Sequence, residues 1–194
     1  CDTDLRKIAF LTCRGGWPQA ALMSDDEEIA LDQAIDYYDA VVNSDIQRVD
    51  NVNRDPERVK RLMRSYARFQ GSQSSFTEIC KDMEANEKSG LDENTISSYL
   101  NALRQIFVVE DMHAWNPNLR SKTAIRSTDT RYFVDPSIAT AALGLGPEDL
   151  MNDLETFGLL FETLSVRDLR VFSQALDGAV SYTHLRAHET CADL

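Results

Sequence analysis

The chain has 194 residues and a formal net charge of −12 at pH 7, with 43% hydrophobic and 27% charged residues. This length allows one sizeable domain or two small ones, and the hydrophobic content is sufficient for a core. The acidic balance argues against attraction of the whole chain to nucleic acid or anionic lipid, and no apolar run reaches the length of a membrane span. The cysteines form neither a CxxC pair nor a disulfide-rich spacing, so we expect a cytoplasmic protein without a membrane partner.

The first expected helix covers residues 3–13, where apolar residues recur at helical spacing. It should end at the segment RGGWP, because Gly15 suits a left-handed C-cap and Pro18 cannot continue the helix. Arg14 would then be a cation at the negative end of the helix dipole.

A long second helix should begin at a capping box formed by Ser24-Asp25-Asp26-Glu27. We expect its apolar stripe to be buried and its acidic face to be solvated. The stripe consists of Leu31, Ile35, Tyr38, Val42, Ile46 and Val49.

Three further helices follow. The first is PERVKRLMRSYARF, with Asp55 as N-cap, Pro56 at the first position and Gly71 at its end. SSFTEICKDM is a short amphipathic helix, and Asp92 starts DENTISSYLNALRQIF. The positions expected to be buried in these helices are Val59, Leu62, Met63, Tyr66, Phe69, Phe76, Ile79, Cys80, Met83, Ile96, Tyr99, Leu100, Leu103 and Phe107.

Three helices with a short second member and a glycine-containing turn are typical of helix-turn-helix domains. VVEDMHAW and RYFVD are expected strands on either side of a basic, turn-rich stretch, and such a ribbon would make the domain winged. The outward side chains of the third helix can bond to bases or phosphates; they are Asn94, Ser97, Ser98, Asn101 and Arg104. A small helical domain that contacts other proteins explains the pattern equally well.

Basic residues recur in this part of the chain, with Lys60, Arg64 and Arg68 spaced as one helical stripe. If the basic residues lie on one side, they form a cationic face that binds duplex DNA weakly and in a salt-dependent way. The alternative is that this face docks on another protein module. The candidate nucleic-acid-binding residues are Lys60, Arg64, Arg68, Asn101, Arg104, Arg120, Lys122 and Arg126, with Arg61 and Arg131 nearby.

Asp135-Pro136 should cap a helix over SIATAALGL, and Gly146-Pro147 should end it. A long helix is then expected over residues 148–176. Its segment FGLLFETL is apolar nearly all round, which predicts burial. Glu162 lies in that segment, and we expect it to pair with a basic residue such as Arg167.

Five segments together resemble the prokaryotic AAA-type ATP-binding proteins over residues 5–178: RGGWP, PERVKRLMRSYAR, DENTISSYLNALRQIFVVEDMHAWNPNLRSK, RYFVDPSIATAALG and DLETFGLLFETLSVRDLRVFSQALDG. The resemblance implies a mostly α (α+β) chain. ATPase lid helices would occupy residues 1–54, a winged-helix domain 55–135, and the start of a restriction-endonuclease-like domain 136–178. It also implies that ATP and Mg serve the intact parent protein, that Arg14 senses nucleotide phosphate, and that the ATPase module is the partner of this chain.

The chain departs from that family at both ends. It contains no GxxxxGK[ST] P-loop. Of the carboxylates and the lysine that form the nuclease metal site in the family, only one glutamate has a counterpart here, Glu162. One carboxylate does not build such a site. We therefore expect a non-catalytic fragment, from an environmental assembly, without cofactor or metal. The alternative is a stand-alone winged-helix DNA-binding regulator with a helical dimerisation arm.

Near the end of the chain, His184 and His188 stand four residues apart beside Glu189, a spacing that suits two zinc ligands on a helix. However, VSYTHLRAHET corresponds codon for codon to a translated sequencing-library adapter. We therefore interpret residues 179–194 as an adapter-derived, unstructured tail without metal. The alternative is a genuine metal site with Cys191 as a third ligand.

Overall fold

The computed structural model describes residues 4–23, 26–50, 52–87, 90–113 and 129–176. This part of the chain is mostly helical, as predicted. None of its helices is both long and apolar enough to cross a bilayer. The elements are α1 (Leu5–Arg14), α2 (Pro18–Leu22), α3 (Glu27–Asn43), the 3-10 helix η1 (Asp45–Arg48), α4 (Pro56–Arg68), α5 (Phe76–Asn86), α6 (Glu93–Gln105), α7 (Pro136–Leu143), α8 (Pro147–Asn152) and α9 (Leu154–Ala175).

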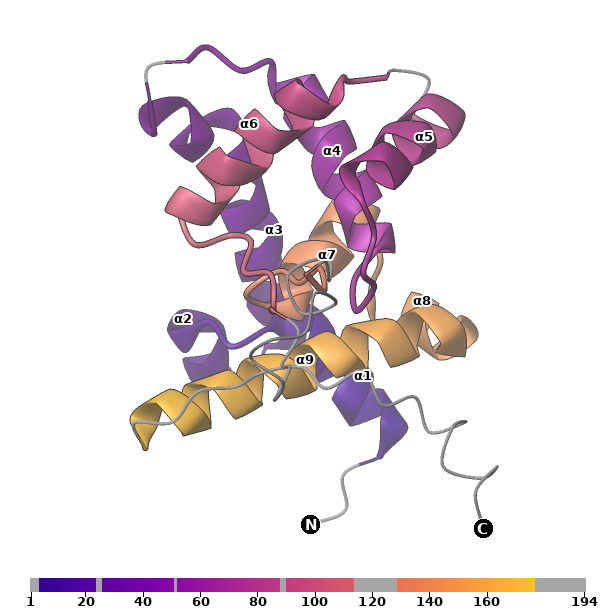
Figure 1. The fold of residues 1–194 in the computed structure, drawn as a ribbon. Coiled ribbons are helices and arrows are strands. Elements are labelled where there is room, and N and C mark those ends of the chain that lie inside the picture. Colours follow the sequence, from indigo (N-terminus) through magenta and orange to yellow (C-terminus); the bar gives the residue numbers. More distant parts are fainter. Residues whose placement is uncertain (1–3, 24–25, 51, 88–89, 114–128, 177–194) are drawn as a thin grey trace, which may run out of the picture.

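The short helix α7 lies at the centre of the molecule, where it packs against α1, α3, α4 and α9 (Figure 1). Asp135 caps its N-terminus by accepting a hydrogen bond from the backbone of Ser137, and Gly144 ends it in the left-handed conformation. Buried apolar residues from α1 through α9 surround α7 in one continuous core. The described parts of the segments 1–54, 55–135 and 136–178 therefore all contribute to this core, and a smaller cluster of Met112, Tyr132 and Val166 lies apart from it.

The start and the buried face of α3 differ from the prediction. Asp26 is the N-cap, accepting from the backbone of Ile29, whereas the predicted cap Ser24 lies outside the described residues. Small residues, Ala30 and Ala34, face the core, and the larger Ile35 of the predicted stripe is 49% exposed. Of the predicted stripe, Tyr38, Val42 and Ile46 are buried as expected. The departure is therefore confined to the first half of α3, where small side chains let the neighbouring helices approach closely.

The helix predicted over residues 148–176 is interrupted. Asp153 adopts a non-helical conformation, and its side chain caps α9 by accepting from the backbone and hydroxyl of Thr156. The predicted burial of FGLLFETL holds for Phe157 and Leu160 but is wrong for Leu159 and Phe161, which remain 40% and 45% exposed. One face of α9 packs on the core, and the opposite face lies open.

The two predicted strands pair in antiparallel fashion, but as isolated bridges between Val109 and Phe133 and between Met112 and Thr130. Residues 71–72 extend this ribbon, since the backbone of Arg131 bonds to both of them at 2.9 and 3.0 Å.

Phe107 was predicted to be buried, yet it is 79% exposed and has a φ of 56°. It takes the left-handed position that ends α6 and turns the chain into the ribbon: the backbone N–H groups of Phe107 and Val108 donate back to Arg104 and Leu103. Because the turn directs this side chain outward, the helical stripe cannot continue through it. Phe69, Phe76 and Cys80 are half-buried rather than buried.

Candidate functional site

The predicted basic stripe of α4 is paired with acidic residues of the same chain. Arg68 bonds to Asp82 at 2.6 Å and to Glu87 at 2.8 Å, and both carboxylates come from the α5 side. Arg64 lies 3.6 Å from Glu87, and Lys60 lies 3.9 Å from Glu57 in the preceding turn of α4. Arg64 and Arg68 of the stripe thus connect α4 to the α5 side and do not form an open cationic face.

The Arg68–Asp82 pair shows how strongly these charges are coupled. Burial alone would raise the pKa of Asp82, but hydrogen bonds from Arg68 and Asn86 outweigh it and lower the pKa. Burial would lower the pKa of Arg68, and its bonds to Asp82 and Glu87 raise it instead. Both groups therefore remain ionised near neutral pH, and each is the other's main partner.

A buried carboxylate, Asp111, joins α4, α6 and the ribbon. Its oxygens accept hydrogen bonds from the Tyr66 hydroxyl, from Arg104 and from Arg131, the last at 2.8 Å. Burial, followed by the negative charge of Asp111, raises the pKa of Tyr66 well above its usual range. Arg131 also donates to the backbone of Ser74 at 2.9 Å. Arg104 and Arg131, two cations of the predicted nucleic-acid-binding face, thus link α6 and the ribbon through Asp111.

The role of Asp111 was not predicted, although a signal was present. Two acidic residues, Glu110 and Asp111, stand between the apolar residues Val109 and Met112 of an expected strand. A carboxylate in such a segment requires a cationic or hydrogen-bonding partner if it is buried.

The outward face of α6 is polar and uncharged over much of its length. Asn94, Ser98 and Asn101 are exposed, and Asn101 accepts a hydrogen bond from Arg104 at 2.8 Å. Ser97 is half-buried. The remaining predicted contacts of the wing lie outside the described residues; they are Arg120, Lys122 and Arg126.

The segment RGGWP is hydrogen-bonded to the start of α7, and we call this contact the clasp. The backbone N–H of Gly16 donates to Asp135 at 2.8 Å, and the indole of Trp17 donates to the hydroxyl of Ser137 at 2.9 Å. Gly15 has a φ of 74°, and a Cβ there would lie 2.4 Å from that hydroxyl. Both its conformation and this close approach require glycine.

Arg14, the predicted nucleotide sensor, lies in the last turn of α1. Its Nε donates to the backbone oxygen of Gly15 at 3.1 Å, and the side chain is half-buried. This position fits a cation that stabilises the negative end of α1. The nucleotide-sensing role stays a prediction.

Glu162 does not pair with Arg167, contrary to the prediction. Its carboxylate accepts a hydrogen bond from the Tyr132 hydroxyl at 2.6 Å and lies against Gly71. Arg167 instead binds Asp135 at 2.7 Å and its neighbour Asp168 at 2.7 Å. Arg167 thus completes the clasp, and Glu162 fixes α9 to the ribbon.

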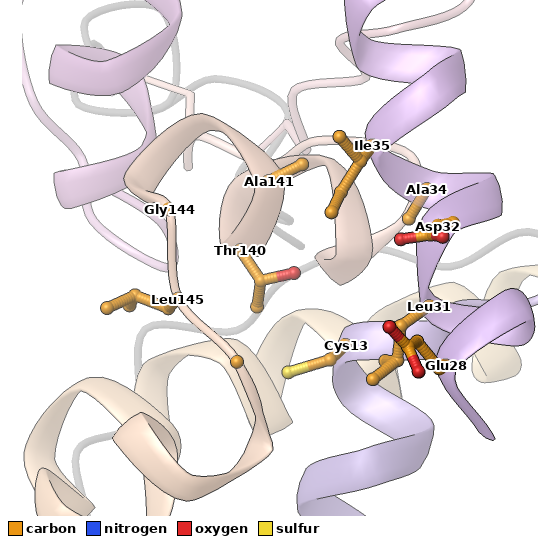
Figure 2. Close-up of a pocket in the computed structure, with 11 residues that line it drawn as sticks. Cys13, Glu28, Leu31, Asp32, Ala34, Ile35, Thr140, Ala141, Gly144 and Leu145 are labelled. Atoms are coloured by element: carbon orange, nitrogen blue, oxygen red, sulfur yellow. The ribbon is translucent and has the colours of Figure 1, made fainter.

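A hollow of about 400 Å³ lies between α1, α3 and the turn after α7. Figure 2 shows Cys13 and Thr140 facing this space from α1 and α7, with Glu28 and Asp32 on α3 beside it. Burial raises the pKa of the Cys13 thiol to about 12. The thiol is therefore protonated at neutral pH and is not an activated nucleophile.

The ATP and magnesium that the AAA-type resemblance implies for the intact parent stay a prediction. The sequence has no P-loop to cradle phosphate, and the described residues contain no group of three potential metal ligands. The candidate ligands His184, His188, Glu189 and Cys191 lie outside the described residues.

Comparison with curated proteins and with solved structures gives no match. A protein family described as "Domain of unknown function (DUF8612)" matches residues 5–149, from the start of α1 to the middle of α8. This match covers most of the chain, including RGGWP, the start of α7, the ribbon and all of the described candidate nucleic-acid contacts, but not Arg167. The chain therefore belongs to the DUF8612 family.

Proposed function

We propose that the chain is a non-catalytic module of an AAA-type ATP-binding protein, and that its α4–α6 region is a winged helix that docks on another protein module. The observation that carries the proposal is that five cations of this region are already paired with carboxylates of the same chain. Lys60, Arg64, Arg68, Arg104 and Arg131 each have a carboxylate of the same chain within 4.0 Å.

The order of elements supports the winged-helix part of the proposal. The helices α4, α5 and α6 are followed directly by an antiparallel ribbon of residues 108–112 and 130–134, and residues 71–72 join its edge. This is the arrangement in which a wing follows the third helix of a helix-turn-helix. The endonuclease-like character of residues 136–178 stays a prediction on the same resemblance.

The ion pairs favour a protein partner over DNA. A phosphate would have to displace Asp82, Glu87 or Asp111, and removing one member of a buried pair leaves an uncompensated charge. The exposed side chains of α6, Asn94 and Ser98, can hydrogen-bond to a protein surface without such an exchange. The partner proposed from the AAA-type resemblance is the ATPase module of the parent protein.

Reading the genomic DNA upstream of Cys1 is the first test. An in-frame P-loop supports the proposal, whereas a start codon near Cys1 contradicts it. The ATPase module encoded there would then be produced separately and titrated with this chain by calorimetry. We expect saturable binding that Ser98→Trp on α6 weakens and that Asp36→Asn, an exposed change on α3, leaves unaltered.

The proposal also predicts that the isolated chain is inactive. Phosphoryl transfer needs a phosphate cradle and a metal, and this chain offers neither from its sequence motifs. Hydrolysis of ATP or of DNA with magnesium should not exceed that of a Glu162→Ala control.

Weak DNA binding is a second candidate, favoured by the sequence between the paired segments of the ribbon. Residues 114–128 contain Arg120, Lys122 and Arg126 and no acidic residue. If this stretch contacts phosphates, duplex DNA should bind with a Kd on the order of 10⁻⁴ to 10⁻⁶ M and weaken with salt. Charge reversal at Arg120 and Lys122 should abolish the fluorescence anisotropy signal, while Asn101→Ala should have little effect. If duplex DNA does not bind, or binds independently of salt, the DNA-binding function is rejected and protein docking remains as the proposed function.

A further inference from the structure

The helix α9 carries two apolar faces on opposite sides. One face packs on the core through Phe157, Leu160 and Val166. The other carries five large apolar side chains that are 45% to 82% exposed: Leu154, Phe161, Leu169, Phe172 and Leu176. Together with two small residues, Gly158 and Ser165, they form a single stripe, which we call the outer stripe. In Figure 1, α9 runs along the base of the molecule.

The outer stripe contains a notch at Gly158. Glycine within a helix is unfavourable relative to alanine, so its presence calls for a local reason. The described residues provide none, because a Cβ added at Gly158 would meet none of their atoms within 4 Å. Directly over this glycine lies an apolar hollow of about 280 Å³ between α1 and α9, with Leu5, Ile8 and Phe161 among its lining residues. The hollow is large enough for one aromatic side chain.

The spacing of the outer stripe is symmetric about Ser165. Residues 161 and 169 lie four positions from Ser165, residues 158 and 172 lie seven, and residues 154 and 176 lie eleven. In an antiparallel pair of helices related by a two-fold axis at Ser165, each position would therefore face another position of the stripe. Phe172 would face Gly158, Phe161 would face Leu169, and Leu154 would face Leu176.

We infer that the outer stripe binds a second copy of this chain, with two α9 helices antiparallel and Phe172 of each inserted in the hollow over Gly158 of the other. Phe172 then meets the small Gly158, and the other two pairs join apolar side chains across the interface, as in knobs-into-holes packing. Ser165 suits the axis, because its hydroxyl donates to the backbone of Phe161 at 2.9 Å and leaves no unsatisfied polar group.

The exposed apolar area is sufficient for such a dimer. With roughly 200 Å² for each fully exposed large side chain, the five residues and Leu5 present on the order of 700 Å² per chain. This exceeds the few hundred Å² that monomeric proteins ordinarily expose in one patch. Two copies would bury on the order of 1,400 Å², within the range of specific interfaces.

Sedimentation equilibrium of the whole chain tests this inference. We expect a monomer–dimer equilibrium, which Phe172→Asp weakens by about 100-fold, as the loss of a central aromatic anchor does. Val171→Asp is the matched control, because Val171 is 57% exposed on the same helix but lies off the outer stripe. Far-ultraviolet circular dichroism checks that both variants fold. A monomer at every concentration, or equal effects of the two changes, would overturn the inference.

Gly158→Leu separates the specific register from general hydrophobic association. It makes the surface more apolar, so unspecific association would strengthen, whereas the proposed dimer should be lost because the notch is filled. The double change Gly158→Phe with Phe172→Ala restores a large residue opposite a small one and should recover dimerisation. Strengthened association of Gly158→Leu would overturn the register, and with it the inference.

A disulfide test locates the two-fold axis directly. In a background with Cys1→Ser and Cys191→Ser, Ser165→Cys should form a covalent dimer on mild oxidation, because residue 165 faces itself across the axis. Ser173→Cys, on the same helix but away from the outer stripe, should remain uncrosslinked. The reverse result would exclude the antiparallel arrangement.

Discussion

The helices α4 and α9 differ in where their side chains find partners. On α4 the apolar residues are buried, and the cations Arg64 and Arg68 bond to carboxylates on the α5 side. On α9 the inner face is packed in the same way, but the outer stripe is exposed to solvent. A helix whose apolar face is buried and whose cations pair with carboxylates of the same chain contributes to stability. A helix with an exposed second apolar face indicates an additional contact.

This difference predicts unequal responses to substitution, and the largest should occur at Asp111. Asp111→Ala leaves Arg104 and the buried Arg131 without their shared carboxylate, and we expect a loss of about 3–5 kcal/mol in the free energy of unfolding. Urea denaturation at neutral pH measures this loss. On α9, Phe172→Ala should change the stability of the monomer by less than about 0.5 kcal/mol. Equal losses would remove the distinction between the two helices.

The next largest effect is expected in the clasp between RGGWP and α7. Gly15→Ala places a Cβ 2.4 Å from the Ser137 hydroxyl at a backbone conformation with a φ of 74°, so we expect a loss of about 3 kcal/mol. Gly144→Ala is the matched control, because Gly144 has a φ of 70° but no atom of the described residues within 4 Å of its Cβ. It should cost about 1 kcal/mol. Similar melting temperatures for the two variants would show that the close approach at Gly15 has little energetic weight.

The sequence predicted most helix starts correctly because their signals are local. Asp55, Asp92 and Asp135 each cap the helix that begins beside them, as expected from their position before Pro56, Glu93 and Pro136. The errors came from competing local signals or from tertiary packing. Asp153 acts as a cap where the apolar pattern suggested a continuous helix, because its carboxylate binds the next turn.

The candidate site was less predictable, since its contacts join distant parts of the chain. Asp135 was identified as a cap, yet it also binds Gly16 and Arg167, which lie 119 and 32 residues away. No periodicity within one helix encodes such pairs. The basic stripe of α4 was identified correctly as a pattern, but its partners on the α5 side became evident only in the fold.

A smaller, pH-dependent effect is expected from the Arg68–Asp82 pair. The folded-state pKa of Asp82 lies below its ordinary value of 3.8, so the pair's contribution is fully present above that value and is lost as the pH falls through the folded pKa. Asp82→Asn should lower stability by about 1 kcal/mol at neutral pH and flatten the decline of stability below about pH 4. Urea denaturation across this range measures both. An unchanged slope would show that other carboxylates dominate the acid response.

The smallest effect concerns Gly158 on the outer stripe of α9, and Gly71, which lies outside α9 against Glu162, provides the comparison. Gly158→Ala should raise the free energy of unfolding of the monomer by about 0.5–1 kcal/mol, because alanine favours the helix and its Cβ meets no neighbour within 4 Å. Gly71→Ala, by contrast, should be destabilising, because Gly71 has a φ of 70° and its Cβ would lie 3.3 Å from the Glu162 carboxylate. Thermal unfolding of both variants at dilute concentration measures the pair. If Gly158→Ala destabilises the dilute monomer, the space above Gly158 is occupied within the chain itself, and α9 has no free outer face.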